Sequence, residues 1–277
     1  MKKIILCFLI FEIIAIGLFL LTDNFFYYLN FTYIGLCITI GLYLYNIETK
    51  YSKYARNFIQ ITIGLYLLIY LGILSSENMM LEGFWYYLFL GVFEAAVLHY
   101  AIAKIFGPFL FGRGWCGYAC WTAMILDLLP YKTPNKKLDH KREKYGYIRY
   151  ILFIISPILV SALFILKMAT NTTMFYLFII VNILYYIIGI ILAYHLKDNR
   201  AFCKYICPIT VFLKIGSKYS LLKIKYDENK CDDCKKCYRS CPMDVDICSN
   251  DKNKTNATEC ILCMSCAKSC KKNALSL

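Results

Sequence analysis

Charged side chains are scarce in this 277-residue sequence: Asp, Glu, Lys and Arg make up 18% of it, whereas 60% of the residues are hydrophobic. A soluble fold of this size could not bury so much apolar surface, so the composition excludes a wholly soluble protein. Part of the chain must therefore use lipid as its solvent.

Acidic residues are the scarcer charges, with 18 Asp and Glu against 31 Lys and Arg, which gives a net charge of +13. Such a surplus suits either nucleic acid or an anionic membrane surface. No nucleic-acid-binding motif accompanies the basic residues, which argues against nucleic acid as a partner. The sequence also lacks a catalytic triad, a nucleotide-binding loop and a flavin site, so a self-contained enzyme is disfavoured.

Six apolar stretches approach the ~20 residues that a helix needs to cross a bilayer. They lie near residues 4–21, 26–45, 58–74, 84–105, 150–166 and 175–194. The first begins with Met-Lys-Lys like a signal peptide, but it has Glu12 in its middle and lacks a small-x-small cleavage site, so we interpret it as a retained anchor. The sequence thus predicts an all-α polytopic membrane domain of about six transmembrane helices over residues 1–223.

The basic residues predict how these helices are oriented. With six alternating spans, every Lys and Arg except Lys167 falls on one side. The positive-inside rule makes that side cytoplasmic, so we expect a multi-pass protein of a bacterial or archaeal cytoplasmic membrane with its N terminus and C-terminal part in the cytoplasm. Two shorter apolar segments, residues 113–129 and 200–215, have basic residues on both flanks and are expected to be interfacial or re-entrant helices.

From residue 224 onward the composition changes, and eight cysteines form two runs. The runs are Cys231-x2-Cys234-x2-Cys237-x3-Cys241-Pro242 and Cys260-x2-Cys263-x2-Cys266-x3-Cys270. A C-x2-C-x2-C run wraps a tight loop around three corners of a cubane cluster, and the fourth thiolate comes from the other run. On that logic one [4Fe–4S] cluster is held by Cys231, Cys234, Cys237 and Cys270, and a second by Cys260, Cys263, Cys266 and Cys241.

Zinc and disulfides fit these runs less well. Zinc ribbons favour two separated C-x2-C pairs, and the cytoplasmic placement disfavours disulfides. Residues 224–277 resemble the bacterial two-cluster ferredoxin, a small α+β domain, and depart from it at Lys271, where a proline often follows the last cysteine. Cys248, between the runs, and Cys7 and Cys37, within the apolar spans, are interpreted as bystanders.

A second cysteine pattern repeats within the membrane part. The segment Arg113-Gly-Trp-Cys116-Gly-Tyr-Ala-Cys120 is echoed by Arg200-Ala-Phe-Cys203-Lys-Tyr-Ile-Cys207. On a helix, a C-x3-C pair places both thiols on one face, one turn apart. Two such pairs at a common cytoplasmic surface could supply four thiolates to a further cluster or a metal ion, or act as two redox-active dithiols. The duplicated spacing argues against four inert apolar thiols.

A polytopic membrane part, two C-x3-C motifs and a terminal two-cluster ferredoxin together resemble the NapH/MauN membrane ferredoxin family, whose relatives include NosR and CcoG. The resemblance covers about residues 84–277. Cys203-x3-Cys207-Pro208 matches the family motif completely, whereas Trp121 stands where the first copy would have proline. The resemblance implies electron transfer between a membrane quinol or another donor and a redox partner.

Two ionisable residues, Glu94 and His99, lie within the apolar stretch of residues 84–105. Such residues are rare inside a membrane, and a quinone site needs proton-accepting groups, so both are candidates for quinone and proton handling. Five residues turn a helix by ~500°, which points these side chains about 140° apart and argues against a pair within one helix. The alternative is a neutral, hydrogen-bonded Glu94 and an interfacial His99.

Three functions are compatible with these patterns. The leading hypothesis is a membrane-anchored iron–sulfur protein that passes electrons between a quinone pool or a cytoplasmic donor and a redox partner complex. One alternative is a copper or other metal reductase, or an assembly factor for a membrane oxidoreductase, because thiolates prefer soft metal ions. The other alternative is a redox sensor whose clusters report oxidation state.

Overall fold

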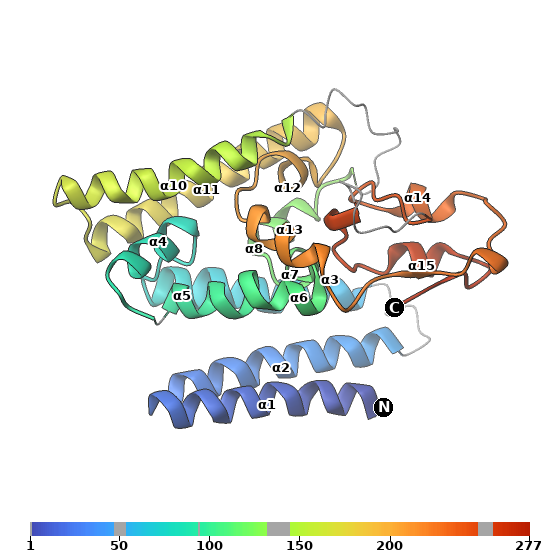
Figure 1. Cartoon of the computed structure of the whole chain (residues 1–277), viewed down its shortest axis with the longest axis horizontal. Coiled ribbons are helices and arrows are strands. Elements are labelled where there is room, and N and C mark those ends of the chain that lie inside the picture. Colours follow the sequence, from blue (N-terminus) through green and yellow to red (C-terminus); the bar gives the residue numbers. More distant parts are fainter. Residues whose placement is uncertain (1, 47–53, 94, 132–144, 249–256) are drawn as a thin grey trace.

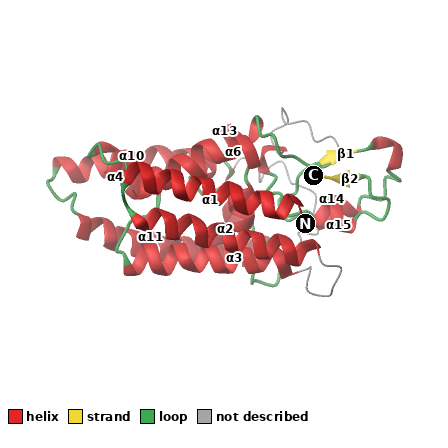
Figure 2. Ribbon diagram, turned by 90° about the horizontal axis from the view of Figure 1, so that it is seen from below, coloured by secondary structure: helices red, strands yellow, loops and turns green. Residues whose placement is uncertain are grey.

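The computed structural model describes residues 2–46, 54–93, 95–131, 145–248 and 257–277. Figure 1 shows an elongated arrangement in which the apolar helices run along the long axis and the C-terminal segment is gathered at one end. Figure 2 shows the same division from a second side, with the two strands confined to that end. The described part of the chain is mostly helical.

Five helices among the described residues are long and apolar enough to cross a membrane. They are Ile4–Thr22 within α1 (Lys2–Thr22), Phe25–Asn46 (α2), Ala55–Leu74 (α3, Ala55–Leu65, continued by the π-helix η2, Tyr66–Leu74), Ile148–Ile165 (α10) and Asn171–Leu196 (α11). Large apolar side chains such as Ile13, Leu20 and Ile165 stand exposed on them. Lipid solvates such side chains, so these helices indicate a membrane protein.

The expected fourth span over residues 84–105 is wrong as a single helix. α4 (Leu81–Phe89) ends in a Schellman motif, in which the N–H groups of Gly91 and Val92 donate to carbonyls of its last turn at 3.1 and 3.0 Å. Gly91 has a φ of +71°, a conformation that glycine adopts without a Cβ clash. The chain resumes in α5 (Ala95–Tyr100), η3 (Ala101–Phe106) and α6 (Gly107–Phe111), which form the shorter apolar helix Ala96–Phe111.

The segments predicted to be interfacial or re-entrant each contain two short helices. Residues 113–129 contain α7 (Gly114–Tyr118) and α8 (Trp121–Leu126), and residues 200–215 contain α12 (Ala201–Tyr205) and most of α13 (Thr210–Lys218). In Figure 1 they lie between the long helices and the C-terminal segment. None of these helices approaches the length needed to cross a bilayer.

The main apolar core gathers buried residues of α3, α5 and α8 into one cluster around α11. Leu67 of η2, Leu126 of α8 and Phe178 of α11 are fully buried members of it. Trp121 Nε1 donates to Asn182 Oδ1 at 2.7 Å, which ties α8 to α11. The hairpin of α1 and α2 lies alongside this bundle in Figure 1.

The C-terminal segment is built from two similar halves. β1 (Lys225–Tyr226) and β2 (Leu275–Ser276) pair antiparallel, with Lys225 opposite Ser276 and Tyr226 opposite Leu275. Between them lie the 3₁₀ turns η4 (Glu228–Lys230) and η5 (Ala257–Glu259) and the helices α14 (Lys236–Ser240) and α15 (Ser265–Ser269). Each cysteine run therefore follows a 3₁₀ turn and continues into a short helix.

The close approach of η2 to α11 predicts an effect on stability. A Cβ at Gly72 would stand 2.3 Å from Cζ of the fully buried Phe178, so Gly72→Ala should lower the free energy of unfolding by about 1–3 kcal/mol. A Cβ at Gly17, in α1, would have no neighbour within 4 Å, so Gly17→Ala is the matched control and should not destabilise. Thermal unfolding of the detergent-purified variants measures both, and equal midpoints would contradict the packing described.

Candidate iron–sulfur and thiol sites

The two C-terminal cysteine runs share an unusual backbone. Left-handed φ angles occur at Asp233 (50°), Lys235 (57°) and Asp244 (53°) in the first half, and at Leu262 (54°), Met264 (60°) and Asn273 (51°) in the second. These positions correspond one to one relative to the cysteines. Left-handed residues between cysteines turn successive N–H groups toward one point and form a nest for an anionic group. Both loops are therefore shaped to surround a negatively charged centre.

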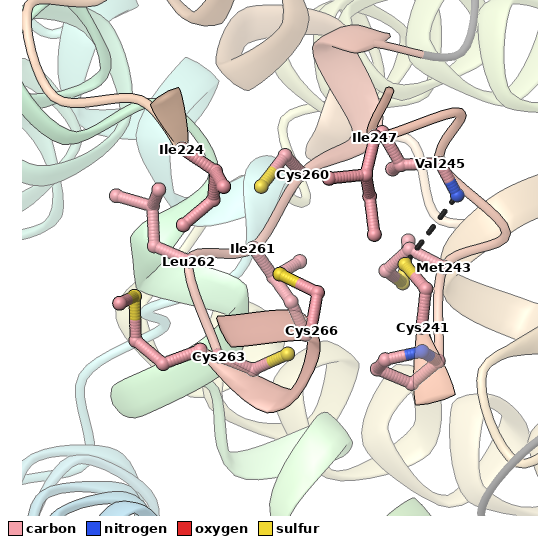
Figure 3. A pocket seen from close by; sticks show the side chains of 12 residues that line it. Ile224, Cys241, Met243, Val245, Ile247, Cys260, Ile261, Leu262, Cys263 and Cys266 are labelled. Atoms are coloured by element: carbon pink, nitrogen blue, oxygen red, sulfur yellow. Dashed lines mark hydrogen bonds between the residues drawn. The ribbon is translucent and has the colours of Figure 1, made fainter. Parts of the chain in front are cut away.

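A cavity lies beside the second run, and Figure 3 shows it at close range. Its lining includes Cys241, Cys260, Cys263 and Cys266 among apolar side chains. The N–H of Val245 lies 3.4 Å from Cys241 Sγ. The structure thus brings one of the two predicted cysteine sets around a single cavity.

The cavity disfavours free thiolates. Burial raises the pKa of Cys241 to about 12 and raises the pKa of Cys266 as well. In the protein alone these side chains are neutral thiols, and a bound metal centre is needed to make the thiolate the stable form. Four thiols, apolar walls and inward-turned N–H groups fit a [4Fe–4S] cluster.

The other predicted set lies nearer the protein surface. Cys234 is exposed, and Cys231, Cys237 and Cys270 are partly buried. Cys248, interpreted from the sequence as a bystander, is a neighbour of this set: burial and the adjacent Cys237 thiol raise its pKa to about 12. The more exposed of the two sets is therefore the one formed mainly by the first run.

The structure brings the two C-x3-C copies together through their arginines. Nη2 of Arg113 donates to the carbonyl of Cys203 at 3.2 Å, and Nη1 of Arg200 donates to the carbonyl of Cys116 at 2.9 Å. Each guanidinium also lies 4.0 Å from the Sγ of the first cysteine in its own copy. The exposed fractions of Arg113 and Arg200 are 0% and 1%. The two copies thus exchange equivalent contacts, as expected of an internal repeat.

The expectation that each C-x3-C pair lies on one continuous helix is wrong. α7 and α12 carry the first cysteine of each pair, and both helices end before the second. The N–H of the second cysteine donates to the carbonyl five residues earlier, at 3.1 Å for Cys120 and 3.0 Å for Cys207. The same wide backbone turn therefore occurs in both copies.

The thiols of the two pairs lie in one environment, in which Cys116 and Cys203 are buried and Cys120 and Cys207 are partly buried. Burial raises the pKa of Cys203 to about 12 and also raises the pKa values of Cys120 and Cys207, and the neighbouring thiols add to this effect. The guanidinium groups of Arg113 and Arg200 act in the opposite direction. A thiolate-bound centre with net negative charge would be compensated by these two buried cations.

Each buried arginine has a carboxylate partner. Asp127 Oδ2 lies 2.5 Å from Arg200 Nη2 and 2.8 Å from Arg56 Nη1, and Glu259 forms an ion pair with Arg113. Burial alone would raise the pKa of the Asp127 carboxyl, but Arg200 and Arg56 outweigh it and hold that pKa below its ordinary value. Two separate carboxylates therefore neutralise the two guanidinium groups.

Sequence reasoning does not single out these ion-pair residues as part of the site. Arg113 and Arg200 open the repeated motif, so their identical spacing from the cysteines is a usable signal. Asp127 and Glu259 belong to no motif, because only the tertiary structure brings each of them to an arginine.

His99 lies against the first C-x3-C copy. Its ring centroid is 4.9 Å from the ring of Trp115, which directly precedes Cys116, and Nζ of Lys104 lies 4.3 Å from the centroid of the same indole. In the part of the chain that the structure describes, Nε2 of His99 has no hydrogen-bond partner. Glu94, the other candidate, lies outside the described residues.

Comparison with protein families defines the class of this protein. The sequence matches the family described as 4Fe-4S dicluster domain over residues 223–271 and the family described as 4Fe-4S binding domain over residues 95–139 and 173–226. The first match contains both cysteine runs, and the second contains both C-x3-C copies. Together with the long apolar helices, these matches define a membrane protein with 4Fe–4S-binding domains.

Relatives that match about two thirds of the chain place the protein in a family. Two uncharacterized proteins of Methanocaldococcus jannaschii are similar: MJ0749 is 29% identical over 186 residues (63% of this chain, 68% of that protein), and MJ0750 is 30% identical over 210 residues (68% of this chain, 84% of that protein). The chain belongs to the same family as MJ0750.

A third relative indicates the chemistry. YccM of Escherichia coli, an electron transport protein by its name, is 32% identical over 84 residues, which are 30% of this chain and 23% of YccM. No solved structure is a significant match. The 4Fe–4S domains and this relative support iron–sulfur electron transfer.

The buried ion pair of Asp127 predicts a large effect on stability. Asp127→Asn leaves the fully buried Arg200 without its carboxylate, so the free energy of unfolding should fall by about 3–5 kcal/mol. Asp227→Asn is the matched control: its ion pair with Lys230 is exposed to solvent, so its loss should cost far less than the loss of the Asp127 pair. Thermal or denaturant unfolding in detergent compares the two variants, and similar losses would contradict the burial of the Arg200 pair.

The lowered pKa of Asp127 also predicts a pH dependence. Because its folded pKa lies below the unfolded value of about 4, the carboxylate contributes its full stabilisation above that pH and loses it as the pH falls through the folded pKa. Unfolding midpoints measured from pH 6 downward should therefore fall less steeply for Asp127→Asn than for the wild-type protein. Parallel curves would show that Asp127 does not contribute this acid dependence.

Proposed function

We propose that the protein is a membrane-anchored iron–sulfur protein that passes electrons between a quinone pool or a cytoplasmic donor and a redox partner complex, as in the NapH/MauN type. The observation that carries this proposal is the cavity lined by Cys241, Cys260, Cys263 and Cys266. Such a donor set suits a one-electron carrier, since a bound cluster supplies the redox chemistry and the protein supplies ligands, burial and hydrogen bonds.

Two [4Fe–4S] clusters are proposed in the C-terminal segment. The first is held by Cys231, Cys234, Cys237 and Cys270, and the second by Cys241, Cys260, Cys263 and Cys266. The repeated left-handed backbone of the two runs supports equivalent roles for them. The match of both runs to one 4Fe-4S dicluster domain supports the same number.

A third thiolate-bound centre is proposed at Cys116, Cys120, Cys203 and Cys207. The exchanged arginine contacts unite the two pairs, and the match to a 4Fe-4S binding domain covers both of them. Arg113 and Arg200, each 4.0 Å from a cysteine Sγ, compensate the negative charge of four thiolates. We favour a cluster over a copper ion here because that family binds 4Fe–4S clusters.

We further propose that the C-terminal segment and the N terminus lie in the cytoplasm of a bacterial or archaeal cell. α1 begins at the end of the molecule that carries the C-terminal segment (Figures 1 and 2), which fits a common side for both. The distribution of Lys and Arg supports the cytoplasmic side, and membrane lipid surrounds the apolar helices.

A quinol is the proposed donor on the membrane side, with His99 as the proton-accepting residue. Oxidation of a quinol releases two electrons and two protons, so it needs a proton acceptor close to the electron-accepting centre. His99 has an unpaired Nε2 among the described residues and touches Trp115, the neighbour of Cys116. His99 therefore offers a proton acceptor and also lies close to the proposed electron-accepting centre at Cys116.

Cluster binding is tested directly on anaerobically purified protein. Iron counting and EPR of the reduced wild-type protein should find two clusters in the C-terminal segment and a further centre at the C-x3-C pairs. Replacing Cys116, Cys120, Cys203 and Cys207 together by Ser should remove that further centre and leave the two others in place. Replacing Cys7 and Cys37 is the matched control and should remove none. Wild-type protein without any cluster would refute the proposed function.

The role of His99 predicts a kinetic effect. His99→Gln should slow reduction of the clusters by a quinol about 100-fold, because an acid–base group of this kind typically contributes that much or more. Reduction by dithionite, which needs no proton acceptor, should stay unchanged. The matched control is His195→Gln, since His195 is exposed near the end of α11. An unchanged quinol rate in His99→Gln would exclude this residue as the acceptor.

A further inference from the structure

The two repeated arginines take their carboxylates from different parts of the chain. Asp127, the partner of Arg200, lies in the first copy, 14 residues after Arg113. The equivalent position of the second copy, 14 residues after Arg200, is Lys214 and carries the opposite charge. Arg113 is paired instead with Glu259, which belongs to the C-terminal segment. The repeat is therefore completed by a carboxylate from outside it.

Glu259 is held by three cations of the membrane part. Besides its ion pair with Arg113, Glu259 Oε1 lies 3.0 Å from Nη1 of Arg149 and 2.9 Å from Nζ of Lys214. All four side chains are largely or completely buried, so solvent screens these contacts little. Lys214 stands at the position that is Asp127 in the first copy. It thus helps to bind Glu259, the carboxylate that pairs with Arg113 in place of a carboxylate at position 214.

Neighbouring residues of the C-terminal segment rest on the same C-x3-C turns. The hydroxyl of Tyr118 donates to the carbonyl of Leu262 at 2.8 Å. A Cβ at Gly117 would stand 2.4 Å from the carbonyl oxygen of Ile261, so glycine permits this close approach. In the second copy the position of Gly117 is taken by Lys204, whose Nζ lies 2.5 Å from Oδ2 of Asp244.

These contacts concern one of the two ferredoxin-type cysteine sets. Glu259, Ile261 and Leu262 lie within two residues of Cys260, and Asp244 lies three residues after Cys241. A single apolar cluster contains Cys241 and Cys266 together with Cys116 of the first C-x3-C copy. In contrast, Cys234 of the other set is exposed.

We propose that Glu259 is the positioning residue that seats the Cys260 loop on the C-x3-C repeat and thereby fixes the order of the electron-transfer centres. The order runs from the four C-x3-C thiols to the Cys241, Cys260, Cys263 and Cys266 set, then to the Cys231, Cys234, Cys237 and Cys270 set, and from exposed Cys234 to the soluble side. This inference rests on the proposed function. In each step one cluster loses the electron that the next one gains, and no bond or proton moves.

The test compares reduction potentials in the full-length, cluster-loaded protein. Glu259→Gln removes a negative charge beside one set, which favours its reduced and more negative state. At a fixed potential, the reduced-to-oxidised ratio of that set should rise at least tenfold, about 59 mV for a one-electron couple, while the other set should not change. Cys234→Ser, which alters the EPR signal of the exposed set, tells the two sets apart.

Three further variants separate the effect of charge from the effect of packing. Glu228→Gln is the matched control, since Glu228 lies in the 3₁₀ turn before the first run but is exposed, and it should shift neither set. Gly117→Ala keeps every charge and pushes on Ile261, so it should speed hydrogen exchange over residues 257–266 without the tenfold shift. Glu259→Asp keeps the charge and should restore the wild-type ratio.

The outcomes distinguish this inference from the proposed function. An unchanged ratio in Glu259→Gln, or a shift of the Cys234-containing set instead, overturns the proposed order. Unchanged hydrogen exchange over residues 257–266 in both Glu259→Gln and Gly117→Ala overturns the seating role. Wild-type protein that binds no clusters refutes the proposed function itself.

Discussion

Two fully buried guanidinium groups, those of Arg113 and Arg200, are the constraint on which the functional part of the structure depends. A charge in an apolar interior is tolerated only beside an opposite charge and hydrogen-bond acceptors. Asp127 and Glu259 supply the carboxylates, and backbone carbonyls of the opposite repeat accept further N–H groups. Satisfying both charges brings together the two C-x3-C copies and the C-terminal segment, which are far apart along the chain.

The scarcity of acidic residues has a structural counterpart at this contact. Asp127, Glu259 and Asp244 are all held in ion pairs that join the cysteine-carrying segments to one another or to the membrane helices. The long apolar helices expose mostly hydrocarbon side chains to their surroundings. Fixed charge is thus concentrated near the thiols, where it affects the stability of a thiolate-bound centre and the potential at which that centre is reduced.

The cysteine spacing and the repeated motif could be predicted from the sequence, because both are local patterns. The single helix over residues 84–105 was a wrong prediction, since average hydropathy does not register the break that Gly91 makes with its left-handed backbone. The continuous C-x3-C helices were wrong for a related reason. The prediction from the spacing took each pair to lie on a regular helix. In the structure the N–H groups of Cys120 and Cys207 donate to the carbonyl five residues earlier, which makes a wider turn than that of an α-helix.

The sequence by itself determined that the chain needs lipid and that its C-terminal cysteines have cluster-binding spacing, because composition and spacing are properties of the linear chain. Only the tertiary structure decided that Arg113 is neutralised by Glu259 and that the Cys260 loop rests on Gly117 and Tyr118. Lys214 stands where the repeat would lead one to expect a carboxylate, so no local pattern names the partner of Arg113. That partner is chosen by the requirement to neutralise a buried charge, which arises only once the separated segments have packed together.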